Sequence, residues 1–215
     1  EQYPDVRLLS LFDPAGNRMA PDVPLAASIP EFSEDAALVL TPAGLGIFHV
    51  DEGTVLYELV PLDGSAGAGP VFVRTLPTGW GYAIAAWNGS EVVAVIAEPN
   101  ADTIWAHEIS ADGSSVGPEV ELHYFGGGGG FVALSLVPRE TDLALLYYRE
   151  GLAIDTLVDG AALSGTIPLA VPVPADLFGM EFMPTRMAWT GTRFAITTTT
   201  EVESGELHLY TVNPD

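Results

Sequence analysis

The side chains in this chain best suited to chemistry are aromatic rings that lie close to glycines. Three segments place aromatic residues on both sides of a glycine. The residues are Trp80, Tyr82, Phe125, Phe131, Phe178 and Phe182. Rings gathered at one end of a fold can stack on sugar rings or fill an apolar pocket of a partner protein. They can equally be ordinary core residues, and the sequence leaves both interpretations open.

Carboxylates form a second candidate group, in short connections between apolar runs. Neighbouring pairs occur at Asp51 and Glu52 and at Glu98 and Asp102. Carboxylate oxygens can bind Ca²⁺ or meet a cationic partner. None of these connections has the Asp-x-Asp spacing of a dedicated calcium loop, so the alternative is a set of solvated, charged turns. We therefore expect no obligatory cofactor, with Ca²⁺ as the one candidate.

Signatures of common catalytic centres are absent from the sequence. Because there is no cysteine, disulfides, thiolate metal sites and a cysteine nucleophile are excluded. The zinc motifs of helical enzymes, a phosphate-binding glycine loop and the Gly-x-Ser-x-Gly nucleophile motif are also missing. The histidines fall in or near separate apolar runs, which favours packing roles over a shared metal site.

Composition limits the partners. The 29 acidic and 7 basic residues give a net charge of −22, which repels nucleic acid and anionic membranes. No apolar run is long enough for a membrane helix, so we expect no membrane insertion. The acidic, cysteine-free, Gly- and Pro-rich composition favours a bacterial protein that is secreted, periplasmic or at the cell surface. Since the chain begins with Glu1, we expect a processed or excised piece of a larger polypeptide or assembly.

The elements that would position these residues follow from a repeated turn. Similar turns contain Gly16, Gly64, Gly113 and Gly160, at intervals of 48, 49 and 47 residues. A period of this length is typical of propeller blades. Short runs rich in Val, Ile, Leu, Thr and aromatic residues separate the turns, and they predict strands rather than helices.

One unit divides into four strands, and the others follow its pattern. Its strands are predicted at residues 83–87, 91–97, 103–109 and 119–125. The units are placed at residues 1–28, 35–76, 82–125, 131–174 and 182–215, with the fourth strand of the fourth unit at 166–173. A four-stranded antiparallel sheet cannot bury its own faces, whereas several sheets packed radially can. The recurring turn would then join the third and fourth strands of each sheet.

The chain also resembles the β-propeller repeats of secreted and cell-surface bacterial proteins. The resemblance lies in AWNGSEVVAVIA at 86–97, AWTGTRFAITTT at 188–199 and ISADGSS at 109–115. It implies an all-β fold in which residues 1–215 form a single β-propeller of four-stranded antiparallel blades. Two strands at the start and three at the end favour five blades, with an irregular terminal blade. Four blades with an extra strand, or part of a larger propeller, are the alternatives.

Two classes of function remain open. The first is a noncatalytic extracellular or surface module for binding or assembly, which recognises a protein or a glycan through one face of the propeller. The second is an enzyme resembling the five-bladed glycoside hydrolases, which cleave with paired carboxylates. A purely structural module of an envelope or filament protein shares the noncatalytic pattern. The predicted inner strands at 83–87, 132–137 and 186–190 contain no acidic residue, which favours the noncatalytic class.

Overall fold

The computed structural model confirms an all-β chain. It describes residues 8–10, 12, 15–18, 22–24, 37–51, 53–63, 65, 67, 69–77, 79, 81–98, 103–124, 132–140, 142–148, 151–158, 162–169, 185–199 and 207–214. Every regular element in these ranges is a β-strand. No helix of the described residues is long and apolar enough to cross a membrane.

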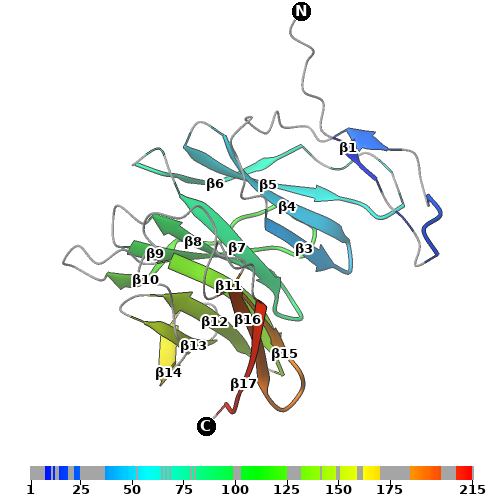
Figure 1. Ribbon diagram of the computed structural model, residues 1–215. Helices are drawn as coiled ribbons and strands as arrows, with labels where there is room; N and C mark the ends of the chain where they lie inside the picture. The colour runs from blue at the N-terminus through cyan, green and yellow to red at the C-terminus, as the bar shows by residue number, and fades with distance from the viewer. Residues whose placement is uncertain are drawn as a thin grey trace, which may run out of the picture.

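Three sheets are four-stranded and antiparallel, and each follows chain order from its first to its last strand (Figure 1). The first sheet consists of β3 (Ala37–Thr41), β4 (Gly44–Asp51), β5 (Thr54–Val60) and β6 (Val71–Thr75). The second consists of β7 (Tyr82–Trp87), β8 (Val92–Glu98), β9 (Thr103–Ile109) and β10 (Val120–Tyr124). The third consists of β11 (Val132–Arg139), β12 (Asp142–Tyr148), β13 (Leu152–Val158) and β14 (Ala162–Pro168).

Two smaller sheets come from the beginning and the end of the chain. The three-stranded last sheet consists of β15 (Arg186–Trp189), β16 (Phe194–Thr199) and β17 (Leu207–Val212). A two-stranded sheet consists of β1 (Leu8–Leu9) and β2 (Val23–Pro24). These elements agree with two predicted strands at the start and three at the end.

The predicted strands lie close to the observed ones, with one clear exception. The fourth strand of the third sheet was expected at 166–173, but β14 spans Ala162–Pro168. The hairpin is tight, because Val158 of β13 already pairs with Ala162. A stretch containing Ser164 and Gly165 gives little apolar signal, so the prediction placed the strand too late.

The recurring turn joins the third and fourth strands, as expected. Between β9 and β10, the backbone N–H of Ser114 donates to Asp112 Oδ1 at 3.1 Å, and Gly113 has a φ of 70°. Hydroxyl hydrogen bonds from Ser110 and Ser114 lower the pKa of Asp112 to about 2. Between β5 and β6, the N–H of Ser65 donates to the Asp63 carboxylate at 2.9 Å. The same side-chain-to-backbone bond therefore recurs one repeat apart.

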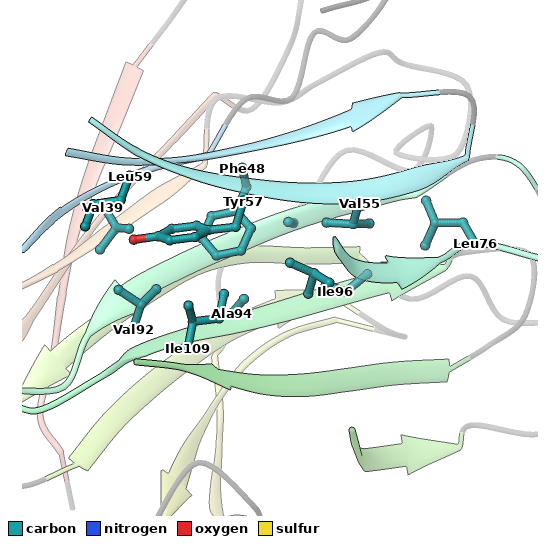
Figure 2. Close-up of a cluster of buried hydrophobic side chains, with 12 residues drawn as sticks. Val39, Phe48, Val55, Tyr57, Leu59, Leu76, Val92, Ala94, Ile96 and Ile109 are labelled. Carbon is teal, nitrogen blue, oxygen red and sulfur yellow. The ribbon is translucent and has the colours of Figure 1, made fainter. Parts of the chain in front are cut away.

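The apolar core lies between neighbouring sheets, because the second and third sheets are apolar on both faces. All seven residues of β8 are buried. Val92, Ala94 and Ile96 face the first sheet (Figure 2). The alternate residues, including Val93 and Val95, pack toward the third sheet. A further cluster joins the third sheet to the last one.

The first strands of consecutive sheets form the inner part of this arrangement. β3 contacts β7, β7 contacts β11, and β11 contacts β15. The sheets are thus arranged side by side along a row of first strands (Figure 1), which is a propeller-type arrangement.

Candidate functional site

In the second sheet, the hairpin between the second and third strands lies at the same end as the connections to the neighbouring sheets. Glu98 pairs with Thr103 beside the hairpin from the second to the third strand. At that end Tyr82, which begins β7, pairs with Ala97, and Tyr124, which ends β10, pairs with Thr103. The connections between consecutive sheets therefore begin and end beside these hairpins. We call this end of the sheets, where the sequence analysis predicts binding, the recognition end.

The connection between the first and second sheets is closely packed at the recognition end. The N–H of Leu76 donates to the carbonyl oxygen of Gly53 at 2.6 Å, and the N–H of Gly79 donates to that of Leu76 at 2.9 Å. A Cβ on Gly53 would lie 3.0 Å from the Gly79 Cα. A Cβ on Gly81 would lie 2.7 Å from the carbonyl oxygen of Ala97. Glycine is therefore needed for this close approach of backbones.

Most of the predicted site residues lie outside the described part of the chain. These are Trp80, Phe125, Phe131, Phe178, Phe182, Glu52 and Asp102. Tyr82 and Asp51 are placed by their backbones alone, at the recognition end of β7 and β4. Their roles in binding stay predictions.

Glu98 has a described side chain, and it is not a solvated turn residue. Its exposed fraction is 1%. Its Oε1 accepts hydrogen bonds from Nε and Nη2 of Arg74, at 3.2 and 3.0 Å. Because Arg74 belongs to β6 and Glu98 to β8, this ion pair joins the first sheet to the second.

Arg74 occupies the centre of a larger polar cluster. Its guanidinium carbon lies 4.1 Å from the ring centroid of Trp105, within the range of a cation–π contact. Its Nη1 forms an ion pair with Glu119, whose side chain is 42% exposed. The guanidinium thus bridges a buried carboxylate and a partly exposed one across the Trp105 ring.

His107 completes this group, and it is held in the neutral form. Its side chain is 3% exposed, and Nε2 lies 3.9 Å from Oε2 of Glu119. Within the described residues, neither ring nitrogen has a hydrogen-bond partner. Burial lowers the pKa of His107; the carboxylate of Glu119 opposes this shift, and the charge of Arg74 adds to it. We call Arg74, Glu98, Trp105, His107 and Glu119 the Arg74 cluster.

The Arg74 cluster links the first sheet to the second through hydrogen bonds and ion pairs. The buried carboxylate of Glu98 is hydrogen-bonded to the guanidinium of Arg74, so it is poorly suited to proton transfer or to binding a cation. Within the described residues no group of three or more His, Asp or Glu side chains could hold a metal ion. Sequence reasoning missed Arg74; the available signal was an arginine inside an otherwise apolar strand.

Comparison with known proteins supports the fold alone. No family model and no curated protein matches the chain. Among solved structures, the chain is similar to "a subtype N10 neuraminidase-like protein of A/little yellow-shouldered bat/Guatemala/060/2010", with a TM-score of 0.57 and 12% identity over 84% of this chain and 56% of that one. It also aligns with Hsv2 of Kluyvelomyces marxianus at a TM-score of 0.48 and 11% identity, over 98% of this chain and 65% of that one.

The chain therefore has a propeller-type all-β fold, and it spans 56% of the neuraminidase-like protein. At this level of identity the likeness concerns the architecture and not the activity.

Proposed function

We propose that this chain is a noncatalytic module for binding or assembly, and that it forms a single five-bladed propeller. It recognises a protein or a glycan through the recognition end. The observation that carries this proposal is the packing of the connection between β6 and β7 against Gly53 and Ala97. A backbone held on both sides by neighbouring strands provides a preorganised platform, which lowers the entropic cost of binding.

The predicted aromatic residues give this platform its chemistry. In the sequence, Trp80 lies between Gly79 and Gly81, and both glycines have defined packing or hydrogen bonds. Tyr82 follows at the start of β7. The ring of a tryptophan in this connection is suited to stacking on a sugar ring or to insertion into an apolar pocket.

A noncatalytic role is supported by the state of Glu98. A glycosidase needs two carboxyl groups placed on either side of the scissile bond. The buried carboxylate of Glu98 is instead bonded twice to Arg74. For Ca²⁺, the predicted ligands that remain are Asp51, Glu52 and Asp102; the backbone of Asp51 lies at the recognition end of β4.

We propose that the module is secreted, periplasmic or at a bacterial cell surface, within a larger polypeptide or assembly. Its acidic composition suits this setting, because a net charge of −22 keeps a protein soluble and favours neutral or basic partners over acidic ones.

The proposal is tested by a glycan array, run with and without Ca²⁺, on the chain and on Trp80→Ala. Phe72→Ala is the matched control, since Phe72 is an exposed aromatic residue on β6. We expect the Trp80 variant to lose binding while the control keeps it and both remain folded by circular dichroism. Equal binding by both variants would contradict recognition through Trp80. No binding by the unmodified chain would remove the glycan half of the proposal.

A further inference from the structure

His107 lies on the side of the second sheet that faces the first sheet. It pairs with Ala94 of β8, and Ala94 belongs to the apolar cluster between these two sheets. Directly opposite residues of an antiparallel pair share one face, so the imidazole lies in this interface. Its side chain is 3% exposed, and neither ring nitrogen has a hydrogen-bond partner among the described residues. Because an unpartnered buried polar group is rare and destabilising, a state in which the ring gains a partner would be favoured.

A single carboxylate oxygen lies within reach of both His107 and Arg74. Oε2 of Glu119 forms an ion pair with Nη1 of Arg74, and it lies 3.9 Å from Nε2 of His107. The second distance is too long for a hydrogen bond, but a shift of about 1 Å would bring the two atoms into range. Glu119 can therefore pair either with Arg74 of the first sheet or with His107 of its own sheet.

The backbone around Glu119 is fixed, whereas its side chain has room to move. On one side, the N–H of Gly117 donates to the carbonyl oxygen of Glu108 at 2.7 Å. On the other side, Val120 pairs with Ala106. Glu119 is held between these two contacts with β9, so a change of partner requires only rotation of its side chain. That side chain is 42% exposed, so solvent reaches the carboxylate beside the imidazole.

The charges in this interface favour such an exchange once the imidazole is protonated. While His107 is neutral, the carboxylates of Glu98 and Glu119 share the guanidinium of Arg74. A protonated His107 supplies a second positive charge, so that each cation can have a carboxylate of its own. Arg74 keeps Glu98, to which it donates two hydrogen bonds. Glu119 is then free to neutralise the imidazolium, because opposite charges at short range attract strongly in a buried interface.

The other titratable groups that face this interface do not produce the response to acid. Burial raises the pKa of Tyr57 of β5 to about 12, so this phenol stays neutral. Glu98 is bonded to Arg74, and Glu121 of β10 is exposed. Histidine is the side chain whose charge ordinarily changes between about pH 5 and about pH 8. Since burial lowers the pKa of His107 from its usual 6.5, its change in charge falls below that pH.

We propose that His107, Glu119 and Arg74 form an acid-operated switch between the first and second sheets. When Nε2 of His107 takes up a proton from solvent, it donates a hydrogen bond to Oε2 of Glu119. The side chain of Glu119 rotates toward β9 and leaves Nη1 of Arg74. Before protonation Glu119 joins the two sheets; after it, Glu119 pairs within the second sheet alone, and Arg74 is held by Glu98.

The opening of this ion pair weakens the support of the recognition end. Arg74 lies shortly before Leu76, whose N–H donates to the carbonyl oxygen of Gly53 in the connection to the second sheet. Without Glu119, β6 loses one of the ionic links that Arg74 makes to the second sheet. A partner at the recognition end would then be released more readily in acid. This last consequence rests on the proposed function, whereas the switch itself does not.

The first test follows the side chains of His107 and Arg74 by NMR as the pH is lowered from about 8 to about 5. We expect the imidazole of the folded chain to titrate below pH 6.5. Across the same step, the guanidinium hydrogens of Arg74 should exchange at least about 10-fold faster relative to those of Arg139. Arg139 is the internal control, because it bonds Asp142 at 2.8 Å away from this interface. An Arg74 signal that does not follow the titration of His107 would overturn the proposal, as would unfolding before His107 is protonated.

A double-mutant cycle tests whether Glu119 gains His107 as its partner. The variants Glu119→Gln and His107→Gln are unfolded in urea, singly and together, at about pH 8 and about pH 5. We expect coupling between the two positions at the lower pH alone, because the neutral imidazole has no hydrogen bond to Glu119. Coupling of equal size at both pH values, or at neither, would refute the exchange of partner.

Two histidine variants separate the switch from a general effect of acid. In His107→Gln, the exchange of the Arg74 guanidinium relative to that of Arg139 should no longer depend on pH. His49→Gln is the matched control, since His49 is a buried histidine of β4, and it should keep the response of the unmodified chain. Loss of the response in both variants would show that acid acts through the packing of the sheets in general. A response kept in both would equally overturn the assignment to His107.

Discussion

Replacing Arg74 by methionine should destabilise the chain far more than removal of an exposed arginine. The variant keeps much of the aliphatic volume but removes the guanidinium that bonds the buried Glu98 carboxylate. Breaking a buried ion pair from one side costs about 3–5 kcal/mol, because the remaining charge stays buried. Loss of the contact with Trp105 at 4.1 Å acts in the same direction.

The expected loss can be measured as a change in unfolding temperature or urea midpoint. For a chain of this size, each kcal/mol lowers Tm by about 2–4 °C, so Arg74→Met should lower it by about 6–20 °C. Arg18→Met is the control, because Arg18 pairs with Asp22 at 3.0 Å on the surface. An exposed pair contributes at most about 1 kcal/mol.

The double variant Arg74→Met with Glu98→Met distinguishes a buried charge from lost packing. Replacing both partners by apolar side chains removes the uncompensated carboxylate, so we expect it to recover at least half of the loss. The reasoning is refuted if Arg74→Met is no more harmful than Arg18→Met. It is also refuted if the double variant is the less stable of the two.

Two further predictions concern His107 and the recurring turn. Burial holds the pKa of His107 below its usual 6.5. Near that pH the unfolded chain therefore binds a proton that the folded chain does not. The free energy of unfolding should consequently fall as the pH drops through 6.5. His107→Gln should flatten this dependence in urea titrations between about pH 8 and about pH 5, and an unchanged slope would contradict a neutral buried imidazole. Gly113 and Gly191 both have positive φ, so alanine at either position carries a backbone penalty of about 1–2 kcal/mol. Only at Gly113 would the new Cβ also meet another side chain, at 3.0 Å from Leu59 Cβ. We therefore expect Gly113→Ala to lower the free energy of unfolding by about 1 kcal/mol more than Gly191→Ala. Equal losses of thermal stability would show that the first sheet yields to the methyl group.

The sequence predicted the features of the fold that depend on neighbouring residues. The turn at Asp112 and Gly113 combines a carboxylate that caps its own backbone with a residue that tolerates positive φ, and both properties are local. β9 was expected at 103–109 and spans Thr103–Ile109, since it is a continuous β-forming run bounded by polar connections. β14 was misplaced because its pairing with β13 already begins at Ala162 and includes the polar Ser164, ahead of a register shift.

The Arg74 cluster was not predictable in the same way. Arg74 lies 24 residues from Glu98 and 45 from Glu119, and these contacts exist because one sheet is stacked on the next. A repeat pattern predicts where the strands of each sheet lie. It does not predict which polar residues of two neighbouring sheets contact each other. Glu98 was for that reason interpreted as part of a charged hairpin, whereas the neighbouring sheet covers it.

The two-sided burial of β8 limits how the length of this chain can change in evolution. Even-numbered residues such as Val92 face the first sheet, and odd-numbered residues such as Val93 face the third. Inserting or deleting one residue within the strand would exchange the two sets and mismatch both interfaces at once. We therefore expect changes in length to be tolerated in the turns beside β8 and not within it, whereas point substitutions in β8 alter one interface at a time. The intervals between turn glycines, 48, 49 and 47 residues, differ by one or two residues, a change that the turns can absorb while the strands keep their length.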